Sequence, residues 1–259
     1  IDKQKLSFLL VPTSGLVMQE KLPKNARLFD QAKYIDQVQK AMKDYNFVDV
    51  RDTLMDHNDE YIYYKTDHHW TSAGACLAYD VWSERTGGEA ETEDGLVKNV
   101  VSDKFRGSLY SKILDADSAY DEIWTYGLQK DDAFGSKDCT VTIDEKQQLD
   151  SIYDDEMLQK KDKYAYFLSG NYGQVHIQNQ KAASKAKGKN ILIIKDSFAN
   201  SFVPFVTQDY ENIYMVDLRY YNGDMKSYLQ EHNITDVLVL YNISNFISDR
   251  NLHKLTGGI

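Results

Sequence analysis

Two short segments contain residue types that can carry out nucleophilic catalysis, and the first is Thr66-Asp67-His68-His69-Trp70. It follows an extended, aromatic-rich stretch at residues 61–65. In an extended chain, residues i and i+2 project to the same side, so Asp67 and His69 face one way and His68 the other. A carboxylate placed there can bond Nδ1 of His69, fix its tautomer and leave Nε2 free. The spacing predicts His69 as a base, Asp67 as its orienting acid and His68 as support.

The second segment is Asp196-Ser197, which follows the apolar run NILIIK and precedes a helical pattern. A serine at a strand-to-helix turn lies beside the N–H groups of the helix start, which can stabilise a developing oxyanion. A serine nucleophile needs a base, and the base needs an orienting acid. Ser197 is therefore the predicted nucleophile. The alternative is that its hydroxyl only caps the helix.

Other histidines and carboxylates leave two rival sites open. Asp249 and His253 are four residues apart on a predicted helix and could form a second acid–base pair. The Asp-His-His run at residues 67–69 could also ligate a divalent ion for phosphoester hydrolysis. The further carboxylates for such a site are Asp49, Asp52 and Asp196. The clustered acidic motif of that chemistry is absent from the sequence, so we predict no metal site and no cofactor.

The elements that must position these segments are most regular in the last 70 residues, where apolar, β-branched runs alternate with helical patterns. The runs cover residues 190–195, 213–217 and 236–241, and the helical patterns cover 198–206, 224–231 and 244–255. Strands alternating with helices indicate right-handed βαβ units and a parallel sheet. The sequence thus predicts an α/β fold, a three-layer α/β/α sandwich with a mainly parallel sheet. Catalytic groups should gather at the carboxyl ends of its strands.

The first part of the chain is expected to extend this sheet. Predicted strands cover residues 6–11, 47–50 and 163–168, and predicted helices begin at an Asn25 cap and at Thr71 or Ser72. Residues 85–160 differ in composition, with frequent Gly, Asp, Glu and Lys and short β-like segments at 122–126 and 139–143. We therefore expect one domain over residues 1–259, with a partly antiparallel insertion at about 85–160.

Composition excludes several classes of protein. The 259 residues carry 40 acidic and 30 basic side chains, a net charge of −10 with no basic stripe, which argues against nucleic-acid binding. No apolar run approaches the ~18 residues of a membrane span. The 19 tyrosines suit a sugar-binding surface or an ordinary core. Cys76 and Cys139 could form one disulfide or two buried thiols. A start at Ile1 without a signal peptide suggests a piece of a longer precursor.

Several segments resemble those of a known family. TDHHWTSAGACLAY, at residues 66–79, resembles the signature of the DHHW proteins, which are relatives of the SGNH-hydrolase-like alginate O-acetyltransferases. ILIIKDSFANSF, at 191–202, resembles the nucleophile segment of that family. Two further segments, FRGSLYSK at 105–112 and YAYFLSGNYG at 164–173, also resemble segments of the family. The resemblance covers roughly residues 6–246. It implies an SGNH-like fold in which the acid and base precede the nucleophile in the chain.

The resemblance also implies roles for individual residues. Asp67 would orient, His69 would act as base and Ser197 as nucleophile, in agreement with the spacing. Arg219 matches a family position near the site and would bind the substrate or the oxyanion. The usual Gly-x-Asn-Asp block is replaced by Asn242-Ile243-Ser244-Asn245, without the glycine or the final acid. The oxyanion donor therefore stays open among three asparagines: Asn171, Asn242 and Asn245.

The function that this resemblance implies is O-acetyl transfer to a polysaccharide, or ester hydrolysis if water is the acceptor. The expected partners are a polysaccharide acceptor and a membrane-bound O-acyltransferase as acetyl donor. The expected location is outside the cytoplasm, either at the cell surface or secreted. Two other functions stay open from the residues: a non-catalytic polysaccharide-binding module, and a metal-dependent phosphoesterase.

Overall fold

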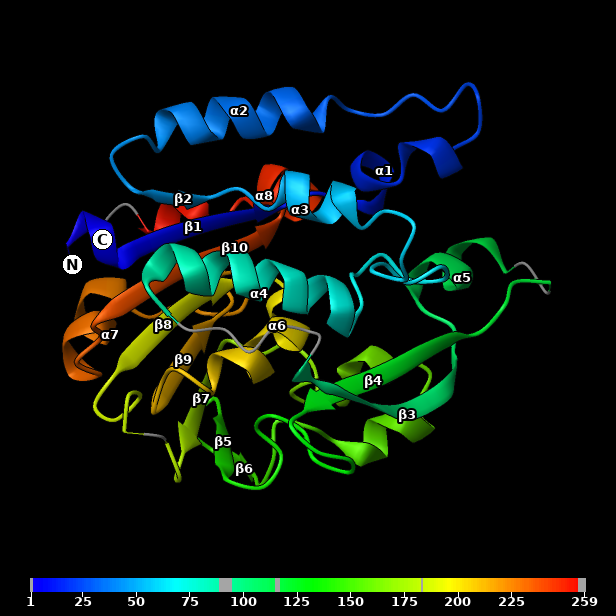
Figure 1. Cartoon of the computed structure of the whole chain (residues 1–259). Helices are drawn as coiled ribbons and strands as arrows, with labels where there is room; N and C mark the ends of the chain where they lie inside the picture. Colours follow the sequence, from blue (N-terminus) through cyan, green and yellow to red (C-terminus); the bar gives the residue numbers. More distant parts are fainter. Residues whose placement is uncertain (1, 89–94, 115–116, 183, 256–259) are drawn as a thin grey trace.

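A mainly parallel sheet forms the centre of the computed structural model, which describes residues 2–88, 95–114, 117–182 and 184–255. Its strands are β1 (Leu6–Val11), β2 (Asn46–Val48), β5 (Cys139–Ile143), β6 (Gln147–Leu149), β7 (Gln174–Asn179), β8 (Asn190–Lys195), β9 (Asn212–Val216) and β10 (Asp236–Asn242). Within the described residues their order is β2-β1-β10-β8-β9-β7-β5-β6 (Figure 1). The five strands from β2 to β9 run parallel, and β7, β5 and β6 continue the sheet antiparallel.

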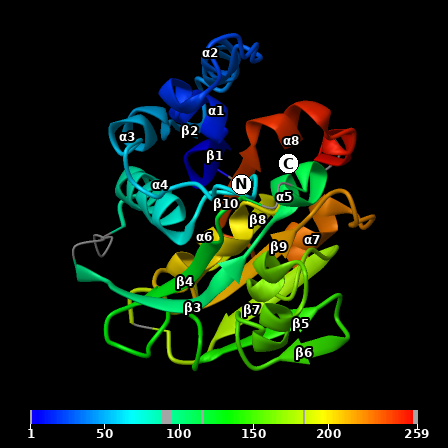
Figure 2. The same cartoon turned by 90° about the vertical axis from the view of Figure 1, so that its right-hand side faces the viewer.

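Helices cover both faces of this sheet, as the sequence predicts (Figure 2). They are α1 (Ser14–Val17), α2 (Gln31–Ala41), α3 (Arg51–Asp56), α4 (Ser72–Thr86), α6 (Ala199–Val206), α7 (Met225–Glu231) and α8 (Ile243–Ser248). Alternate side chains of β8 enter different cores. Ile191 and Ile193 lie in one core cluster with Phe202 of α6, whereas Leu192 lies in the other with Met225 of α7. A sheet buried on both faces explains why its strands read as unbroken apolar runs.

A second, smaller sheet lies beside the first and pairs β3 (Val97–Phe105) with β4 (Asp121–Gly127) in antiparallel fashion. A short helix, α5 (Ser108–Ile113), follows β3. Partly antiparallel structure within residues 85–160 was expected. Part of it, β5 and β6, belongs to the edge of the main sheet and part forms the separate β3–β4 sheet (Figure 1). That residues 85–160 are an insertion into one domain stays a prediction.

Some predicted boundaries were wrong. Residues 163–168 do not form a strand: they contain the 3-10 helix η5 (Lys163–Tyr166), followed by a single bridge from Phe167 to Tyr153. The strand β7, which sequence reasoning missed, takes that place in the sheet. The alternation of polar and apolar residues in QVHIQN is the signal that could have found it, because β7 buries only Val175 and Ile177.

Helix ends also differ from expectation. The first long helix begins at Gln31 and not after Asn25, because the Asp30 carboxylate accepts the Lys33 N–H and caps it there. Thr71 caps α4, as predicted. The expected helix over 244–255 is divided into α8 and the 3-10 helix η6 (Leu252–Leu255). The remaining 3-10 helices are η1 (Lys3–Lys5), η2 (Gln19–Lys21) and η4 (Asp155–Gln159).

Two further sequence questions have structural answers. Cys76 and Cys139 are separate buried thiols and are not joined by a disulfide. No helix in the part of the chain that the structure describes is long and apolar enough to cross a membrane. The longest of these helices, α4, has 15 residues.

Candidate active site

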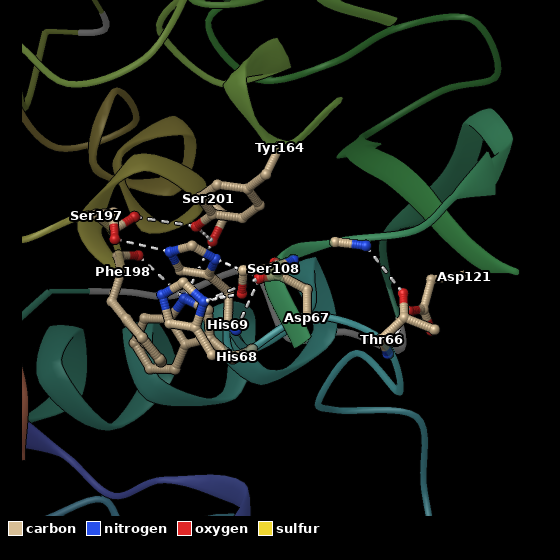
Figure 3. Close-up of polar contacts among 12 residues, drawn as sticks. Thr66, Asp67, His68, His69, Ser108, Asp121, Tyr164, Ser197, Phe198 and Ser201 are labelled. Carbon is tan, nitrogen blue, oxygen red and sulfur yellow. Dashed lines mark hydrogen bonds and ion pairs between the residues drawn. The ribbon is translucent and has the colours of Figure 1, made fainter. Parts of the chain in front are cut away.

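The candidate site lies at the carboxyl edge of the parallel strands, where such folds place their ligands. Strand β8 ends at Lys195, and Asp196 and Ser197 form the turn into α6. The loop of residues 65–70 reaches this turn from the start of α4. Figure 3 shows His69 between Ser197 on one side and Asp67 on the other. The structure therefore brings together two segments that are 128 residues apart.

The three predicted residues form one hydrogen-bonded chain. His69 Nε2 lies 2.7 Å from Ser197 Oγ, and His69 Nδ1 lies 2.5 Å from Asp67 Oδ1. The backbone N–H of His69 also donates to Asp67 Oδ1, at 3.0 Å. All three side chains are buried. A carboxylate on Nδ1 keeps the proton there, so Nε2 can accept the hydroxyl proton of Ser197.

The charge state of Asp67 suits this role. Burial by itself would raise the pKa of the Asp67 carboxyl. The hydrogen bond from His69, the charges of His69 and His68, and a 2.7 Å bond from the Ser108 N–H outweigh burial and hold the pKa well below its usual range. Asp67 is therefore ionised at neutral pH, the charge state that the predicted orienting acid requires.

The position of His68 differs from the prediction. It does not point away from His69, because residues 65–69 form a bend and not an extended strand. The centroids of the two imidazole rings are 3.9 Å apart. His68 Nδ1 lies 2.6 Å from Ser108 Oγ, and burial lowers the pKa of His68 to about 4. A neutral, half-exposed imidazole thus stands next to the predicted base.

The loop that carries the acid and base is held by a residue that sequence reasoning missed. Asp121, buried at the start of β4, accepts hydrogen bonds from the Thr66 N–H at 2.7 Å, the Thr66 hydroxyl at 2.5 Å and the Lys65 N–H at 2.9 Å (Figure 3). The Tyr61 hydroxyl also donates to it. Gly107 packs against the other side of the loop. A Cβ there would lie 2.3 Å from Asp67 Cβ, so only glycine fits.

Two aromatic side chains hold the turn that contains Asp196 and Ser197. The Trp70 indole N–H donates to the Phe198 carbonyl and the Ser201 hydroxyl, both at 3.0 Å. The Tyr164 hydroxyl donates to the Ser197 carbonyl at 3.0 Å, and its ring stacks on His69 with centroids 3.8 Å apart. The alternative role of Ser197 as a helix cap is wrong. Phe198 occupies the N-cap position, and the Ser197 hydroxyl contacts His69.

Two of the candidate oxyanion donors are engaged elsewhere. Asp196 is fully buried, which raises its pKa, and its Oδ2 accepts from the Asn242 N–H and from Asn245 Nδ2, each at 2.8 Å. The Asn242 amide donates to the Val11 carbonyl at 3.3 Å. These contacts tie the ends of β8, β10 and β1 together. Asn242 and Asn245 therefore act as structural links at the edge of the sheet.

The other two candidates have different surroundings. Arg219, just after β9, makes a two-pronged contact with the buried Asp217, through Nε at 2.9 Å and Nη2 at 2.6 Å. This contact holds its guanidinium at the end of the strand and leaves about a third of the side chain exposed. Asn171 is exposed in the turn after η5, and its Oδ1 accepts from Lys195 Nζ at 2.8 Å.

The rival acid–base pair does not form on a helix. Asp249 lies just past the end of α8 and accepts from the Tyr241 hydroxyl at 3.2 Å and from the Asn251 amide at 2.8 Å. His253 is exposed, and its Nδ1 lies 2.8 Å from the Arg250 carbonyl. The spacing argument for this pair fails because the predicted helix is interrupted between them.

The metal-site alternative competes with the same geometry. Asp67, His68 and His69 each offer a ligand atom, and these atoms lie within 4.8 Å of one another. The lone pair of His69 Nε2, however, already faces the Ser197 hydroxyl, and Asp67 Oδ1 already accepts from His69 Nδ1. A cation bound by all three residues would have to replace these hydrogen bonds. The donor set therefore fits the acid–base chain better than a metal.

Comparisons with known proteins agree with this fold. A family model described as DHHW protein matches residues 18–216. A DHHW family protein from Eubacterium siraeum DSM 15702 is 23% identical, with a TM-score of 0.82 over 99% of this chain and 84% of that one. Bacillus cereus PatB1, solved with a sulfonyl adduct, is 23% identical, with a TM-score of 0.76 over 99% and 87% of the two chains.

A more distant structure shares the same architecture. The O-acetyltransferase domain of Pseudomonas putida AlgJ is 14% identical, with a TM-score of 0.54 over 97% of this chain and 79% of that domain. A comparison with the curated proteins found no match. The expected fold is confirmed: an SGNH-hydrolase-like α/β/α sandwich with a mainly parallel sheet and a small antiparallel sheet.

Proposed function

The chain belongs to the DHHW family, and on this premise we propose that it is an O-acetyltransferase that acts on a polysaccharide outside the cytoplasm. The observation that carries the proposal is the continuous contact from Asp67 through His69 to Ser197, with distances of 2.5 and 2.7 Å. An acid, an imidazole and a hydroxyl hydrogen-bonded in this order convert a serine into a nucleophile at neutral pH.

In the proposed first half-reaction, Ser197 Oγ attacks the carbonyl carbon of an acetyl ester. Its proton passes to His69 Nε2, and the carbonyl oxygen takes the negative charge of the tetrahedral intermediate. Asp67 stabilises the imidazolium. When the intermediate collapses, the donor's C–O bond breaks and the departing oxygen receives the proton from His69. The enzyme is left with an acetyl ester on Ser197 and a neutral His69.

The second half-reaction reverses these roles. A sugar hydroxyl gives its proton to His69 Nε2 and attacks the acetyl carbon, and the Ser197 oxygen leaves with that proton. The product is an O-acetylated sugar. If water takes the place of the sugar, the same steps release acetate, so an esterase differs from a transferase only in the acceptor. We propose the transferase because the similar AlgJ domain is an O-acetyltransferase.

The partners follow from the same proposal. The acceptor is a polysaccharide, and the acetyl donor is a membrane-bound O-acyltransferase that hands over the group outside the cytoplasm. The half-exposed His68 beside His69 offers a polar ring to an incoming hydroxyl. The exposed fraction of Arg219 offers a second polar contact at the same edge of the sheet. Both stay proposed substrate contacts.

The test is formation of an acetyl-enzyme. Incubation with 4-nitrophenyl acetate should add one acetyl group to Ser197, found by peptide mass spectrometry, with release of one equivalent of 4-nitrophenolate. Ser197→Ala should remove the adduct and lower turnover by ~10³-fold or more, since nucleophile and base act as a unit. Ser248→Ala, in the exposed part of α8, is the matched serine control and should behave as the unchanged protein.

A second probe separates the competing functions. Because PatB1 was solved with a sulfonyl adduct, a sulfonyl fluoride should also modify Ser197, and His69→Ala should prevent the reaction. A chelator should leave ester turnover unchanged. Inhibition by the chelator would support the phosphoesterase alternative. Glycan binding without any modification of Ser197 would support the binding module.

A further inference from the structure

A buried lysine directly precedes the turn that contains Asp196 and Ser197, and the proposed mechanism gives it no role. Lys195 is 1% exposed at the last position of β8. Burial lowers its pKa to about 8, while the charges of Asp217 and Asp196 oppose that change and Arg219 adds to it. An ammonium group is costly to bury unless hydrogen-bond partners compensate. Its partners therefore indicate why it is there.

Both partners of Lys195 are asparagine side chains. Its Nζ donates to Asn171 Oδ1 at 2.8 Å and to Asn200 Oδ1 at 2.7 Å. An amide has an oxygen on one side and an N–H2 group on the other. Each hydrogen bond from Lys195 therefore turns the oxygen of one amide toward the lysine and its N–H2 group away. Asn200, in the first turn of α6, also donates from its backbone N–H to the Ser197 carbonyl at 3.2 Å. Lys195 thus links the Asn171 turn to residues on both sides of Ser197.

The turn that carries Asn171 has an unusual backbone. Three consecutive residues before it have positive φ: Leu168 at 63°, Ser169 at 57° and Gly170 at 123°. Non-glycine residues rarely adopt this conformation, and such strain persists only where surrounding contacts enforce it. Here Asn200 Nδ2 donates to the Gly170 carbonyl at 3.2 Å, and the Ser169 hydroxyl donates to Asp154 at 2.7 Å.

Asn171 also differs from the other two candidate donors. The side-chain amides of Asn242 and Asn245 each donate to a residue at the sheet edge. The Asn171 oxygen faces Lys195, whereas its N–H2 group has no hydrogen-bond acceptor among the residues that the structure describes. The residue is also exposed, so a ligand can reach it. A donor that is fixed, unengaged and accessible is what a developing oxyanion requires.

We propose that Asn171 donates its side-chain N–H to the acyl oxyanion formed on Ser197, and that Lys195 is the positioning residue that orients it. The inference rests on the proposed acyl transfer. When Ser197 attacks, the negative charge on the carbonyl oxygen is met by an amide whose orientation is set before the substrate arrives. Lys195 itself does not touch the substrate. Its buried amine prevents the Asn171 amide from turning its oxygen toward the anion.

The sharpest single test is Asn171→Asp. The aspartate keeps an oxygen for Lys195 but has no N–H, so the contact to the buried amine survives while the donor is lost. We expect the rate of Ser197 acetylation by 4-nitrophenyl acetate to fall by ~10²–10³-fold with little change in KM. Asn222→Asp is the matched control, because the Asn222 oxygen also accepts from a lysine, Lys254 at 3.0 Å, but the residue is exposed and makes no hydrogen bond to Lys195 or to Ser197. The control should keep the original rate.

The role of Lys195 requires a double-mutant cycle. If Lys195 acts through Asn171, then Lys195→Met lowers kcat by about tenfold or more, and the double variant Lys195→Met/Asn171→Ala is no slower than Asn171→Ala alone. Lys195→Gln, which keeps an N–H donor, should retain more activity than Lys195→Met and serves if the methionine variant does not fold. Each variant is checked by its unfolding midpoint, so that a loss of structure is not read as a loss of chemistry.

Each result has one meaning. An Asn171→Asp rate within about threefold of the unchanged protein would overturn the inference about Asn171. A double variant whose loss of rate equals the product of the two single losses would overturn the inference about Lys195. In both cases the proposed function stands, provided that Ser197 is acetylated and Ser197→Ala is not. If the unchanged protein never acetylates Ser197, the proposed function fails and this inference fails with it.

Discussion

At the scale of single residues, the freedom of His69 is restricted from three directions. Asp67 and Ser197 hold its two ring nitrogens, and Tyr164 lies flat against the ring with an interplanar angle of 8°. Tyr164 is fixed in turn by its hydrogen bond to the Ser197 carbonyl. A base held in one orientation, at hydrogen-bond distance from its proton donor, needs little reorganisation before it reacts. These buried contacts fix the His69 ring, although it lies on a bend and not on a regular element.

The neighbouring His68 predicts a pH effect on stability. Its pKa is about 4 in the folded protein and 6.5 ordinarily, so between these values the unfolded chain binds more protons. The stability due to neutral His68 is therefore fully present above pH 6.5 and falls as the pH drops toward 4. His68→Gln should reduce the change in urea midpoint between about pH 7 and pH 4.5. An equal change in midpoint for His68→Gln and the unchanged protein would contradict the prediction.

At the scale of elements, the site depends on contacts that join the loop of residues 65–70 to three other elements. Asp121 joins it to β4, Ser108 joins it to α5, and Trp70 joins it to the start of α6. None of these contacts lies within one helix or strand. The small β3–β4 sheet therefore takes part in positioning the site, because it supplies the carboxylate that receives four donors from residues 61–66.

The contact between Trp70 and α6 can be tested with a matched pair of tryptophans. Trp70→Phe keeps an aromatic ring in the core but loses the N–H that bonds the Phe198 carbonyl. We expect a loss of about 1–3 kcal/mol in unfolding free energy and a lower rate of Ser197 acetylation, because a buried acceptor loses its partner. Trp82→Phe is the control, since the buried Trp82 indole N–H has no partner in the described part of the chain. The control should keep the rate of Ser197 acetylation, whatever the loss of ring volume does to stability. Equal losses of acetylation in the two variants would contradict a role for the hydrogen bond.

At the scale of the whole molecule, the parallel strands bring distant segments to one edge. The ends of β1, β10 and β8 are linked through Asn242 and Asp196, and Ser197 follows directly. Residues from the first third of the chain reach this edge because α4 packs against α6 in the same layer (Figure 1). The topology thus explains how His69 can lie beside Ser197, which follows it by 128 residues in the chain.

The net charge of −10 predicts a preference among acceptors. A neutral oligosaccharide should accept acetyl groups at a rate that changes little with salt. A carboxylated oligosaccharide of the same length should be a poorer acceptor at low salt, and its rate should rise as salt screens the repulsion over about 10 Å at 0.1 M. Acetyl transfer measured at low and high sodium chloride checks this. A carboxylated acceptor that is better at low salt would show that a local basic patch around Arg219 outweighs the net charge.

The sequence by itself determined much of the fold, and it was enough to predict that Asp67, His69 and Ser197 come together. The strands at 6–11, 190–195 and 236–242 are unbroken apolar runs because both faces of the sheet are buried, and local composition is enough to find them. The Asp-x-His spacing placed Asp67 on the ring of His69, although a bend and not a strand brings them together. Both the apolar strands and the Asp-x-His spacing depend on residues that are close together in the chain, so the sequence alone is enough to identify them.

Only the tertiary structure decided which other residues complete the site. Asp121, Tyr164 and Lys195 lie 31 or more residues from one another, and nothing in their local sequence shows which partner each side chain contacts. Their contacts with Thr66, Ser197 and Asn171 form only when the sheet and its helices pack. Burial then makes each contact selective, because an unpaired polar group in the core is costly. Long-range packing, which no short motif records, therefore decides how the predicted residues are held.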